Sequence, residues 1–271
     1  MKVQNNIDFR KQSISEYLDK YKPLNEFTAL YCIIINVTNR CNLSCSFCPQ
    51  SNKDNLINEH DIMNDSVLDA IIHNTINFRG EFSISGFGEP TLHPRIDHIV
   101  QQLMQISKVR LVSNGSFPEI LKKVRPSIID ISLYNEKLYQ FYIENIKLFP
   151  SRIRLNPQFL SGNTFFNNKS GNVITVKNIP RHCCNIPLMK TLIDTNGDIL
   201  LCCSDWKREK VYGNILVDDL YDIWINRMRE DKMNLLQNRR DLCGICSRCN
   251  SPGNLYGDEF AEYWRKYYEE H

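Results

Sequence analysis

The 271-residue sequence predicts an α/β fold in two parts, a partial (β/α)6 TIM-like barrel and a small C-terminal domain of a β-hairpin and helices. Three observations predict it. Six short apolar runs alternate with amphipathic segments between residues 30 and 177, which is typical of parallel strands joined by helical crossovers. Six strands are too few to close an eight-stranded barrel. From Pro180 onward the alternation stops and cysteine-rich loops follow.

The composition is that of an ordinary globular protein. Hydrophobic residues make up 42% and charged residues 24%, and 33 Lys and Arg stand against 31 Asp and Glu. This near balance argues against a dedicated nucleic-acid-binding protein, which carries a basic excess. No apolar run approaches the length of a membrane span, and the first residues lack the apolar core of a signal peptide. We therefore expect no membrane partner and a cytoplasmic, reducing environment.

The elements of the barrel follow in order along the chain. Residues 1–29 are a lead-in, in which Phe9–Tyr21 is expected to be an amphipathic helix that ends before Pro23. The barrel is expected over residues 30–179, with strands at Tyr31–Val37, Glu81–Ser85, Val109–Ser113, Ile128–Leu133, Arg152–Asn156 and Val173–Lys177. Its helices are expected at Asp65–Phe78, Ile96–Ile106, Pro118–Val124 and Glu136–Phe149.

The C-terminal domain is expected over residues 180–271, with its boundary to the barrel near 178–182. The stretch 192–201 is predicted to form two short strands joined at Asn196-Gly197, a dipeptide that favours tight hairpins. Two further helices are expected, at Val217–Leu236 and Glu259–Tyr268.

Cysteine is the unusual component of the sequence. There are 11 cysteines, an odd number, and ten of them fall in three tight groups. Because no export signal is present, clustered thiols favour metal binding over disulfide bonds.

The first group, Cys41, Cys45 and Cys48, follows the first predicted strand, at the end of the barrel where catalytic sites lie. Its Cys-x3-Cys-x2-Cys spacing places three thiolates on one short loop. Such a loop suits three corners of a cubane iron–sulfur cluster and leaves the fourth iron open to another ligand. A zinc site is the alternative, although zinc sites usually pair two Cys-x2-Cys or His elements.

Because Phe47 precedes the third cysteine, the run resembles the Cys-x3-Cys-x-aromatic-Cys signature of the radical S-adenosylmethionine (SAM) enzymes. The resemblance implies that Cys41, Cys45 and Cys48 hold a [4Fe-4S] cluster whose open iron binds the amino and carboxylate groups of SAM. Reductive cleavage of SAM then gives methionine and a 5′-deoxyadenosyl radical, which abstracts a hydrogen atom from the substrate. Phe47 is implied to lie near the adenine.

Three later segments at the ends of predicted strands resemble further elements of this family. Gly86-Phe87-Gly88-Glu89-Pro90 resembles its Gly-Gly-Glu-Pro element, in which glycines let the backbone approach the SAM amino group. Ser113-Asn114-Gly115 resembles the element near the SAM ribose and carboxylate, and Ile131-Ser132-Leu133 resembles the Ile-Ser-Leu strand. The cofactor-binding residues that the resemblance implies are Gly86, Gly88, Glu89, Ser113, Asn114 and Ser132.

Arg154 is a further candidate because it alternates with apolar Ile153 and Leu155 on the fifth predicted strand. If Arg154 faces the site, its guanidinium is able to pair with the SAM carboxylate. A surface or structural arginine is an equally good interpretation of the same pattern.

The remaining cysteine groups together resemble the shortened SPASM, or twitch, domain attached to many radical SAM enzymes. Cys184 and Cys202 flank the hairpin, with Gly197 five residues before Cys202, and Cys243 and Cys246 form a Cys-x2-Cys pair. The resemblance implies that these four cysteines hold one auxiliary [4Fe-4S] cluster. A structural zinc ribbon is the alternative.

Four cysteines are left over. Cys183 is an alternative to Cys184, Cys32 is expected to be a small core residue, and Cys203 is expected to pack beside the cluster. Cys249 stays open between three roles: an alternative ligand, a catalytic hydrogen-atom donor, or an inert thiol.

The resemblance specifies the type of reaction more closely than it specifies the substrate. One-electron oxidation of a substrate radical needs an electron acceptor, and an auxiliary cluster is suited to that role. The leading hypothesis is an oxidoreductase that dehydrogenates a hydroxyl group of a sugar, cyclitol or related small molecule, as some dehydrogenases of this family do. A flavodoxin- or ferredoxin-type protein is expected to supply electrons, and no nucleic acid is expected as a partner.

Three alternatives stay open. An epimerase would return a hydrogen atom from a cysteine thiol, with Cys249 or Cys203 as the donor. A peptide-modifying enzyme often carries an N-terminal peptide-recognition domain, for which the residues before the first predicted strand are too few. A non-catalytic metal-binding module would not need the elements at residues 86–90 and 113–115.

Overall fold

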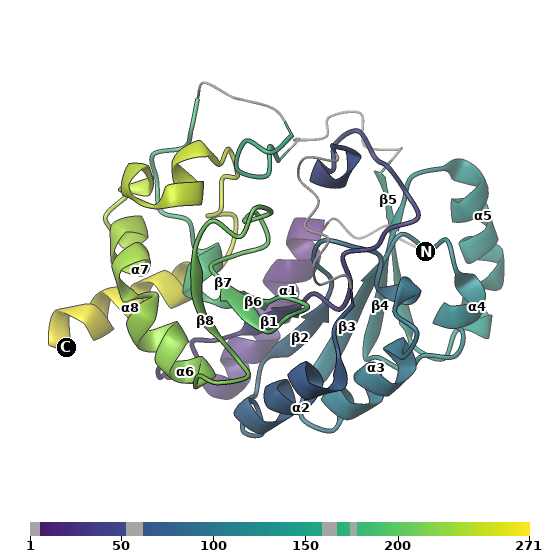
Figure 1. Cartoon of the computed structure of the whole chain (residues 1–271), viewed down its shortest axis with the longest axis horizontal. Coiled ribbons are helices and arrows are strands. Elements are labelled where there is room, and N and C mark those ends of the chain that lie inside the picture. The colour runs from purple at the N-terminus through teal and green to yellow at the C-terminus, as the bar shows by residue number, and fades with distance from the viewer. Residues whose placement is uncertain (1–5, 53–61, 159–166, 174–177) are drawn as a thin grey trace.

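The computed structural model describes residues 6–52, 62–158, 167–173 and 178–271, and it has the α/β fold predicted from the sequence. Its described strands form one open sheet in the order β5-β4-β3-β2-β1-β6-β7-β8 (Figure 1). The strands are β1 (Cys32–Ile35), β2 (Glu81–Ile84), β3 (Lys108–Ser113), β4 (Ile128–Leu133), β5 (Arg152–Pro157), β6 (Lys190–Ile193), β7 (Asp198–Leu200) and β8 (Val211–Asn214).

Helices follow the alternation that the sequence predicts. Asn64 caps α2 by accepting a hydrogen bond from the amide of Val67, and Asn135 caps α5 in the same way. A π-helical turn, Ile223–Arg227, lies between α6 and α7, within the helical region predicted at Val217–Leu236. The helices are α1 (Asn6–Tyr21), α2 (Asp65–Asn74), α3 (Ile96–Met104), α4 (Pro118–Leu121), α5 (Glu136–Asn145), α6 (Leu220–Asp222), α7 (Arg229–Leu236) and α8 (Asp258–Glu270).

Strands β1 to β5 are parallel to their neighbours and lie where the sequence predicts them. Ile35 is level with Ile84, and Leu111 is level with Ile129, so the carboxyl ends of these strands meet at one edge of the sheet. This edge is where such folds place their chemistry. Of the sixth predicted strand, Val173–Lys177, residues 174–177 lie outside the described residues.

The predicted hairpin is present, and it extends the same sheet. Strand β6 pairs in parallel with β1, from Lys190 beside Cys32 to Ile193 beside Ile35. Strand β7 then returns antiparallel, after a turn in which Gly197 has a φ of 90°. The C-terminal cysteine loops are therefore anchored next to β1.

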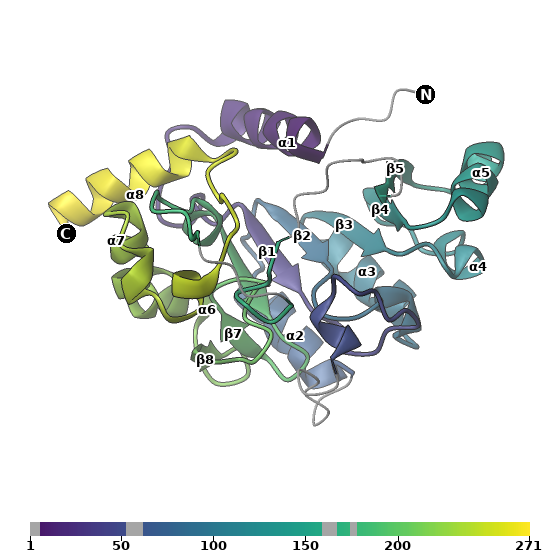
Figure 2. The same ribbon diagram turned by 90° about the horizontal axis from the view of Figure 1, so that it is seen from above.

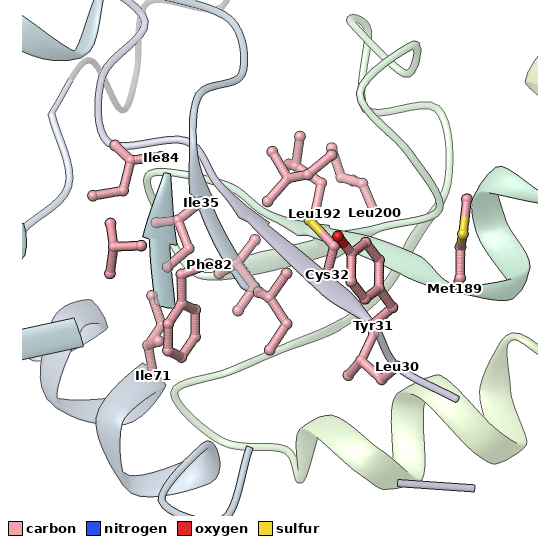
Figure 3. Packing of buried hydrophobic residues seen from close by; sticks show 14 of the residues in the cluster. Leu30, Tyr31, Cys32, Ile35, Ile71, Phe82, Ile84, Met189, Leu192 and Leu200 are labelled. Carbon is pink, nitrogen blue, oxygen red and sulfur yellow. The ribbon is translucent and has the colours of Figure 1, made fainter. Parts of the chain in front are cut away.

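The two faces of the sheet differ in character because successive side chains of a strand point to opposite faces. On the outer face Ile35 and Phe82 are fully buried, and Figure 3 shows both beside Ile71 of α2. Burial of each such side chain contributes about 1.5–3 kcal/mol to folding. The opposite face, called here the inner face, carries apolar Cys32 and Ile34 together with the polar and charged residues Ser83, Arg110, Asp130, Arg154 and Lys190.

Helices α1 and α8 lie together on one side of the sheet, opposite α2 (Figure 2). The ring of Phe9 in α1 lies against the Arg154 guanidinium, 4.7 Å away, and Trp264 of α8 donates its indole N–H to the Leu188 carbonyl at 2.7 Å. None of the helices in the described part of the chain combines the length and the apolar character that a membrane crossing requires.

Candidate active site

Two cavities lined by cysteines adjoin the inner face. The first, of about 260 Å³, lies at the carboxyl ends of β1 to β4. It brings together ten residues that the sequence analysis singled out: Cys41, Cys45, Phe47, Cys48, Gly86, Gly88, Glu89, Ser113, Asn114 and Ser132. The other residues that line this cavity, for which the sequence predicts no role, are Leu43, Ser85, Phe87, Val112, Tyr134, Lys169 and Trp206.

The cysteine loop is fastened to the glycine-rich loop by Gln50, whose Nε2 donates to the Phe87 carbonyl at 2.6 Å. Within the cysteine loop the Cys48 amide donates to the Cys45 carbonyl at 2.9 Å, which closes a tight turn. Burial raises the pKa of the thiols of Cys41, Cys45 and Cys48. Metal binding releases such protons because the thiolate is the ligand.

Glu89 is a buried carboxylate that fastens two loops together. Its Oε1 accepts hydrogen bonds from the hydroxyls of Thr91 at 2.6 Å and Ser113 at 2.8 Å. Its Oε2 accepts from the amide of Asn114 at 2.7 Å. Hydrogen bonds to a buried charged acceptor are among the stronger ones in proteins. Glu89 therefore fixes the Ser113-Asn114 segment against the glycine-rich loop.

Gly86 and Gly88 lie where the glycine-rich loop packs on the chain that follows β1. Gly86 has a φ of 137°, which L-residues rarely adopt, and a Cβ there would lie 2.8 Å from the Asn36 side chain. A Cβ at Gly88 would lie 2.3 Å from the Thr38 carbonyl oxygen and 2.5 Å from that of Arg40. Both glycines are thus required for loop packing, and they also leave backbone exposed to the cavity.

Aromatic rings form part of the cavity wall. The ring centroids of Phe47 and Tyr134 lie 5.4 Å apart, and those of Phe87 and Trp206 lie 4.7 Å apart. Burial raises the pKa of Tyr134 to about 12, so the phenol stays protonated. Flat apolar surfaces of this kind suit a purine ring.

The second cavity, of about 280 Å³, lies between the inner face and the C-terminal loops. Three of the four predicted auxiliary ligands line it, and the fourth, Cys243, does not. The Cys243 thiol instead points to the Asp231 carbonyl at 3.5 Å. The cysteines that line the cavity are Cys32, Cys184, Cys202, Cys203, Cys246 and Cys249.

The thiols in and beside this cavity influence one another electrostatically. Burial is the main cause that raises the pKa of Cys184, to about 12, and that of Cys202. At Cys202 the Cys203 thiol is the next cause, and the Cys249 thiol raises the pKa of both Cys184 and Cys202 further. The pKa of Cys246 is raised by its hydrogen bond with Cys243, by burial, and by Cys202 and Cys184. We call Cys184, Cys202, Cys246 and Cys249 the thiol quartet. No disulfide links the described cysteines.

Arg240 holds the loops around the quartet. Its buried guanidinium donates to the carbonyls of His182 at 2.9 Å, Ser251 at 2.7 Å and Pro252 at 2.6 Å. Next to it, a Cβ at Gly253 would lie 2.3 Å from the sulfur of Cys184. The quartet therefore has close backbone on one side and a fixed positive charge nearby, which suits a set of thiolates.

The two cavities meet at Ser85 and Val112, which line both of them. Ser85 directly follows β2, and Val112 lies in the neighbouring strand β3. A small molecule at this junction would lie between the first cysteine group and the thiol quartet.

Arg154 is the one predicted cofactor-binding residue that does not line the first cavity. Its guanidinium pairs with Asp130 at 2.5 Å and also donates to Asn6 at 3.2 Å. The arginine already has a carboxylate partner within the sheet, so the geometry gives no support to a contact with the SAM carboxylate.

Comparisons with known proteins agree with this division of the site. Residues 35–135 match the model of the radical SAM superfamily, and residues 183–250 match SPASM, an iron–sulfur cluster-binding domain. The first match contains the Cys41–Cys48 loop and the glycine-rich loop, and the second contains the thiol quartet.

One curated relative is the S-adenosyl-L-methionine-dependent 2-deoxy-scyllo-inosamine dehydrogenase of Niallia circulans. It is 22% identical over 236 residues, which span 81% of this chain and 92% of the relative. The crystal structure of BtrN in complex with AdoMet and 2-DOIA superimposes with a TM-score of 0.72 at 19% identity, covering 85% of this chain and 97% of that chain.

A second solved structure shares the fold less closely. Streptococcus suis SuiB bound to precursor peptide SuiA has a TM-score of 0.52 at 16% identity, covering 83% of this chain and 71% of that chain. With a radical SAM domain and a SPASM domain matched in the order expected from the sequence, the chain is a radical SAM superfamily enzyme whose cofactors are SAM and [4Fe-4S] clusters.

Proposed function

We propose that the chain is a radical SAM dehydrogenase that oxidises a hydroxyl group of a sugar, cyclitol or related small molecule to a carbonyl. One observation carries the proposal: the cavity of the first cysteine group and the cavity of the thiol quartet meet at Ser85 and Val112. A substrate at that junction reaches both redox centres of the enzyme.

The overall chemistry requires two centres. Oxidation of a secondary alcohol to a ketone removes one hydrogen atom from carbon, one proton from oxygen and one further electron. When bound, SAM on the first cluster supplies the radical that takes the hydrogen atom, and the auxiliary cluster accepts the electron. The residues of the chain position the substrate. Ser85 lies at the junction, where its hydroxyl is able to hydrogen-bond the reacting hydroxyl of the substrate, and Val112 forms an apolar wall there.

In the first cavity we assign Cys41, Cys45 and Cys48 as ligands of the SAM-binding cluster. Phe47 is assigned to the adenine. The exposed backbone around Gly86 and Gly88, with Asn114, is assigned to the polar groups of SAM, and Glu89 and Ser113 keep these loops in place. Three thiols on one loop fit a cluster that keeps one iron open.

In the second cavity we assign the thiol quartet as the ligands of the auxiliary cluster. Four thiols from three segments converge there, and four thiolates complete a cubane. This assignment takes Cys249 in place of Cys243, because Cys249 lines the cavity, whereas Cys243 does not line it and its thiol bonds to the Asp231 carbonyl and to the Cys246 thiol.

The relative whose name specifies an aminocyclitol dehydrogenase supports an alcohol substrate. Its low identity leaves the substrate itself to experiment. A flavodoxin- or ferredoxin-type protein as electron donor and a cytoplasmic, reducing location remain parts of the proposal. The clusters need a source of electrons, and the 11 free cysteines are typical of a reducing compartment.

An epimerase is the second candidate, and one observation favours it. Cys203 lines the second cavity and is not part of the thiol quartet, so it is a thiol available to return a hydrogen atom to a substrate radical. A peptide substrate is less well supported, since the peptide-bound relative SuiB has the lower structural similarity of the two solved structures compared.

The first test is anaerobic reconstitution followed by iron and sulfide analysis. Two cubanes predict about eight irons per chain, and a Cys45→Ala variant should keep about four. Incubation with SAM and dithionite should release 5′-deoxyadenosine from the wild type and not from the variant. Zinc without iron, or an iron-loaded protein that leaves SAM intact, would exclude the proposed activity.

A second test separates the two outcomes. In deuterated buffer, with a panel of sugars and cyclitols, a dehydrogenase gives a carbonyl product that borohydride reduces. An epimerase gives an isomer of the substrate with one deuterium bound to carbon, and Cys203→Ala should then abolish turnover while a dehydrogenase tolerates the change.

A further inference from the structure

The inner face carries four charges that balance one another. Arg110 pairs with Glu81 at 2.8 Å and approaches Asp130 to 3.6 Å, and Arg154 pairs with the same aspartate at 2.5 Å. Two arginines thus stand against two carboxylates, all nearly buried. This network is electrically neutral and is satisfied by the protein itself.

Lys190 and Arg10 are two further cations that this network does not balance. Lys190 begins β6, is only 4% exposed and lines the second cavity. Among the described residues its ammonium has no hydrogen-bond or ion-pair partner. It lies 5.2 Å from the ring centroid of Tyr256 and 6.0 Å from that of Tyr31. Arg10 of α1 lines the same cavity, also without an ion pair to a described residue.

The rest of the cavity wall offers no acid to these cations. Among the described residues that line it there is no aspartate or glutamate, and the other lining cations are Arg110 and Arg240. Arg110 belongs to the balanced network, and Arg240 is hydrogen-bonded to three backbone carbonyls beside the quartet. Lys190 and Arg10 are therefore two cations without a carboxylate partner among the described residues that line the cavity.

A buried, unpaired ammonium is unfavourable in the absence of a ligand. Burial, and next the positive charge of Arg10, lower the pKa of Lys190 to about 7, while Cys32 and Glu81 act in the opposite direction and Arg110 adds to the decrease. An anion placed in the cavity would remove this penalty by pairing with both cations. The auxiliary cluster that the thiol quartet would hold is itself negative, but the charged groups with the recorded effects on Lys190 are Arg10, Cys32, Arg110 and Glu81, not the quartet thiols. The Lys190 end of the cavity therefore suits a further negative group.

We propose that the substrate carries an acidic group, a carboxylate or a phosphate, which binds between Lys190 and Arg10 at the floor of the second cavity. The proposal rests on the proposed function, since it takes this cavity to hold the substrate. The acidic end would lie at the starts of β1 and β6, and the reacting hydroxyl would lie toward Ser85. The same two cations would repel the ammonium of an aminocyclitol, so the substrate of this chain would differ from that of the relative named as an inosamine dehydrogenase.

Binding is measured by isothermal titration calorimetry on the anaerobic holoenzyme saturated with SAM. The probes share one ring and differ in charge: glucose, glucosamine, glucuronate and glucose 6-phosphate. We expect at least one acidic probe to bind roughly 10- to 100-fold tighter than glucose and glucosamine. Comparison of glucuronate with glucose 6-phosphate shows whether the site prefers a carboxylate or a phosphate.

Lys190→Gln should weaken binding of the acidic probe about tenfold or more, and Arg10→Gln should weaken its binding as well. Lys108→Gln is the matched control, because Lys108 lies in the same row of the sheet, two strands beyond β1, but is exposed. Because removal of a buried unpaired charge is not expected to unfold the chain, Lys190→Gln should melt no lower than the wild type.

Three results would overturn the proposal: glucosamine binding as tightly as the acids, neither acid binding, or Lys190→Gln leaving the acid affinity unchanged. The release of 5′-deoxyadenosine from SAM and dithionite without substrate tests the proposed function separately. If 5′-deoxyadenosine is released and any of these three results is found, the acidic substrate is rejected and the proposed radical SAM activity is retained.

Discussion

Asn36, directly after β1, donates its side-chain amide to the Asp194 carboxylate, directly after β6, at 2.7 Å across 158 positions of the sequence. The Asn36 side-chain oxygen accepts the amide of Phe87 at 3.1 Å. Asp194 in turn pairs with Arg208 at 2.6 Å, whose guanidinium lies 4.1 Å from the centre of the Phe87 ring. One buried asparagine thus connects the glycine-rich loop of the radical SAM domain to the hairpin of the SPASM domain.

Replacement of Asn36 by alanine is expected to destabilise the protein by about 1–3 kcal/mol, because the Phe87 amide loses its acceptor in a buried position. The affinity for SAM should fall as well, since the glycine-rich loop lines the first cavity. Urea unfolding and SAM titration measure the two effects. Asn226→Ala is the control, because that side chain is exposed and bonds to Asp222 four residues before it. Equal stability of the two variants would contradict this role of Asn36.

Glu89→Gln should weaken SAM binding although it changes few atoms. The carboxylate accepts from Thr91, Ser113 and Asn114 through both oxygens, and glutamine replaces one oxygen with a donor that faces an N–H or O–H group. The loss is expected to be about 1–3 kcal/mol in unfolding free energy, with SAM affinity reduced roughly tenfold. Glu119→Gln, at a side chain 76% exposed, should change neither quantity.

Gly88→Ala should disrupt the first cavity, whereas Gly244→Ala should be tolerated. An added Cβ at position 88 meets two backbone carbonyl oxygens at 2.3 and 2.5 Å, which only a shift of the loop relieves. At position 244 nothing lies within 4 Å of the added atom, although the residue adjoins Cys243. Cluster absorbance and SAM titration on both variants test the contrast. A Gly88→Ala protein that binds SAM like the wild type would show that the loop moves freely.

The parallel half of the fold could be predicted from sequence because its strands are short apolar runs and the first four, β1 to β4, are each followed by a predicted helix. The residues of the first cavity could be predicted because they sit directly after those strands, as at Ser113 and Asn114. The position of the hairpin could not. Nothing local in Lys190–Ile193 specifies that it pairs with β1, since the edge of a sheet is chosen by tertiary packing.

Other parts of the site leave no signal in the sequence. Lys169 and Trp206 reach the first cavity from segments far along the chain, with no spacing that marks them. The repeat Cys243-x2-Cys246-x2-Cys249 offers two equivalent pairs, and only the fold shows which thiols face Cys184 and Cys202. Arg154 alternates like a residue that faces the site, but Asp130 on the neighbouring strand pairs with it.

Cys249→Ser and Cys243→Ser should differ in iron content after anaerobic reconstitution. Loss of a quartet thiol should remove the auxiliary cluster and leave about four irons per chain, while loss of Cys243 should leave about eight. The reason is placement: Cys249 lines the cavity with the other three thiols, and Cys243 does not. The opposite pattern of iron contents would return Cys243 to the ligand set.

His93 is expected to make stability depend on pH in mildly acid solution. Its Nδ1 accepts the Arg95 amide at 3.1 Å, so Nε2 carries the proton and donates to the Met63 carbonyl at 2.9 Å. Burial lowers the pKa of His93, so the unfolded chain binds a proton that the folded chain excludes.

The stability that His93 contributes is therefore complete above its ordinary pKa of about 6.5, and it is lost as pH falls from there toward the lowered folded value, by up to about 1.4 kcal/mol per pH unit. A His93→Gln variant keeps a donor and an acceptor but cannot titrate. Urea unfolding of both proteins at several pH values isolates the effect, because cluster contributions cancel in the difference. Parallel curves for wild type and variant below about pH 6.5 would mean that the buried imidazole takes up its proton in the folded state.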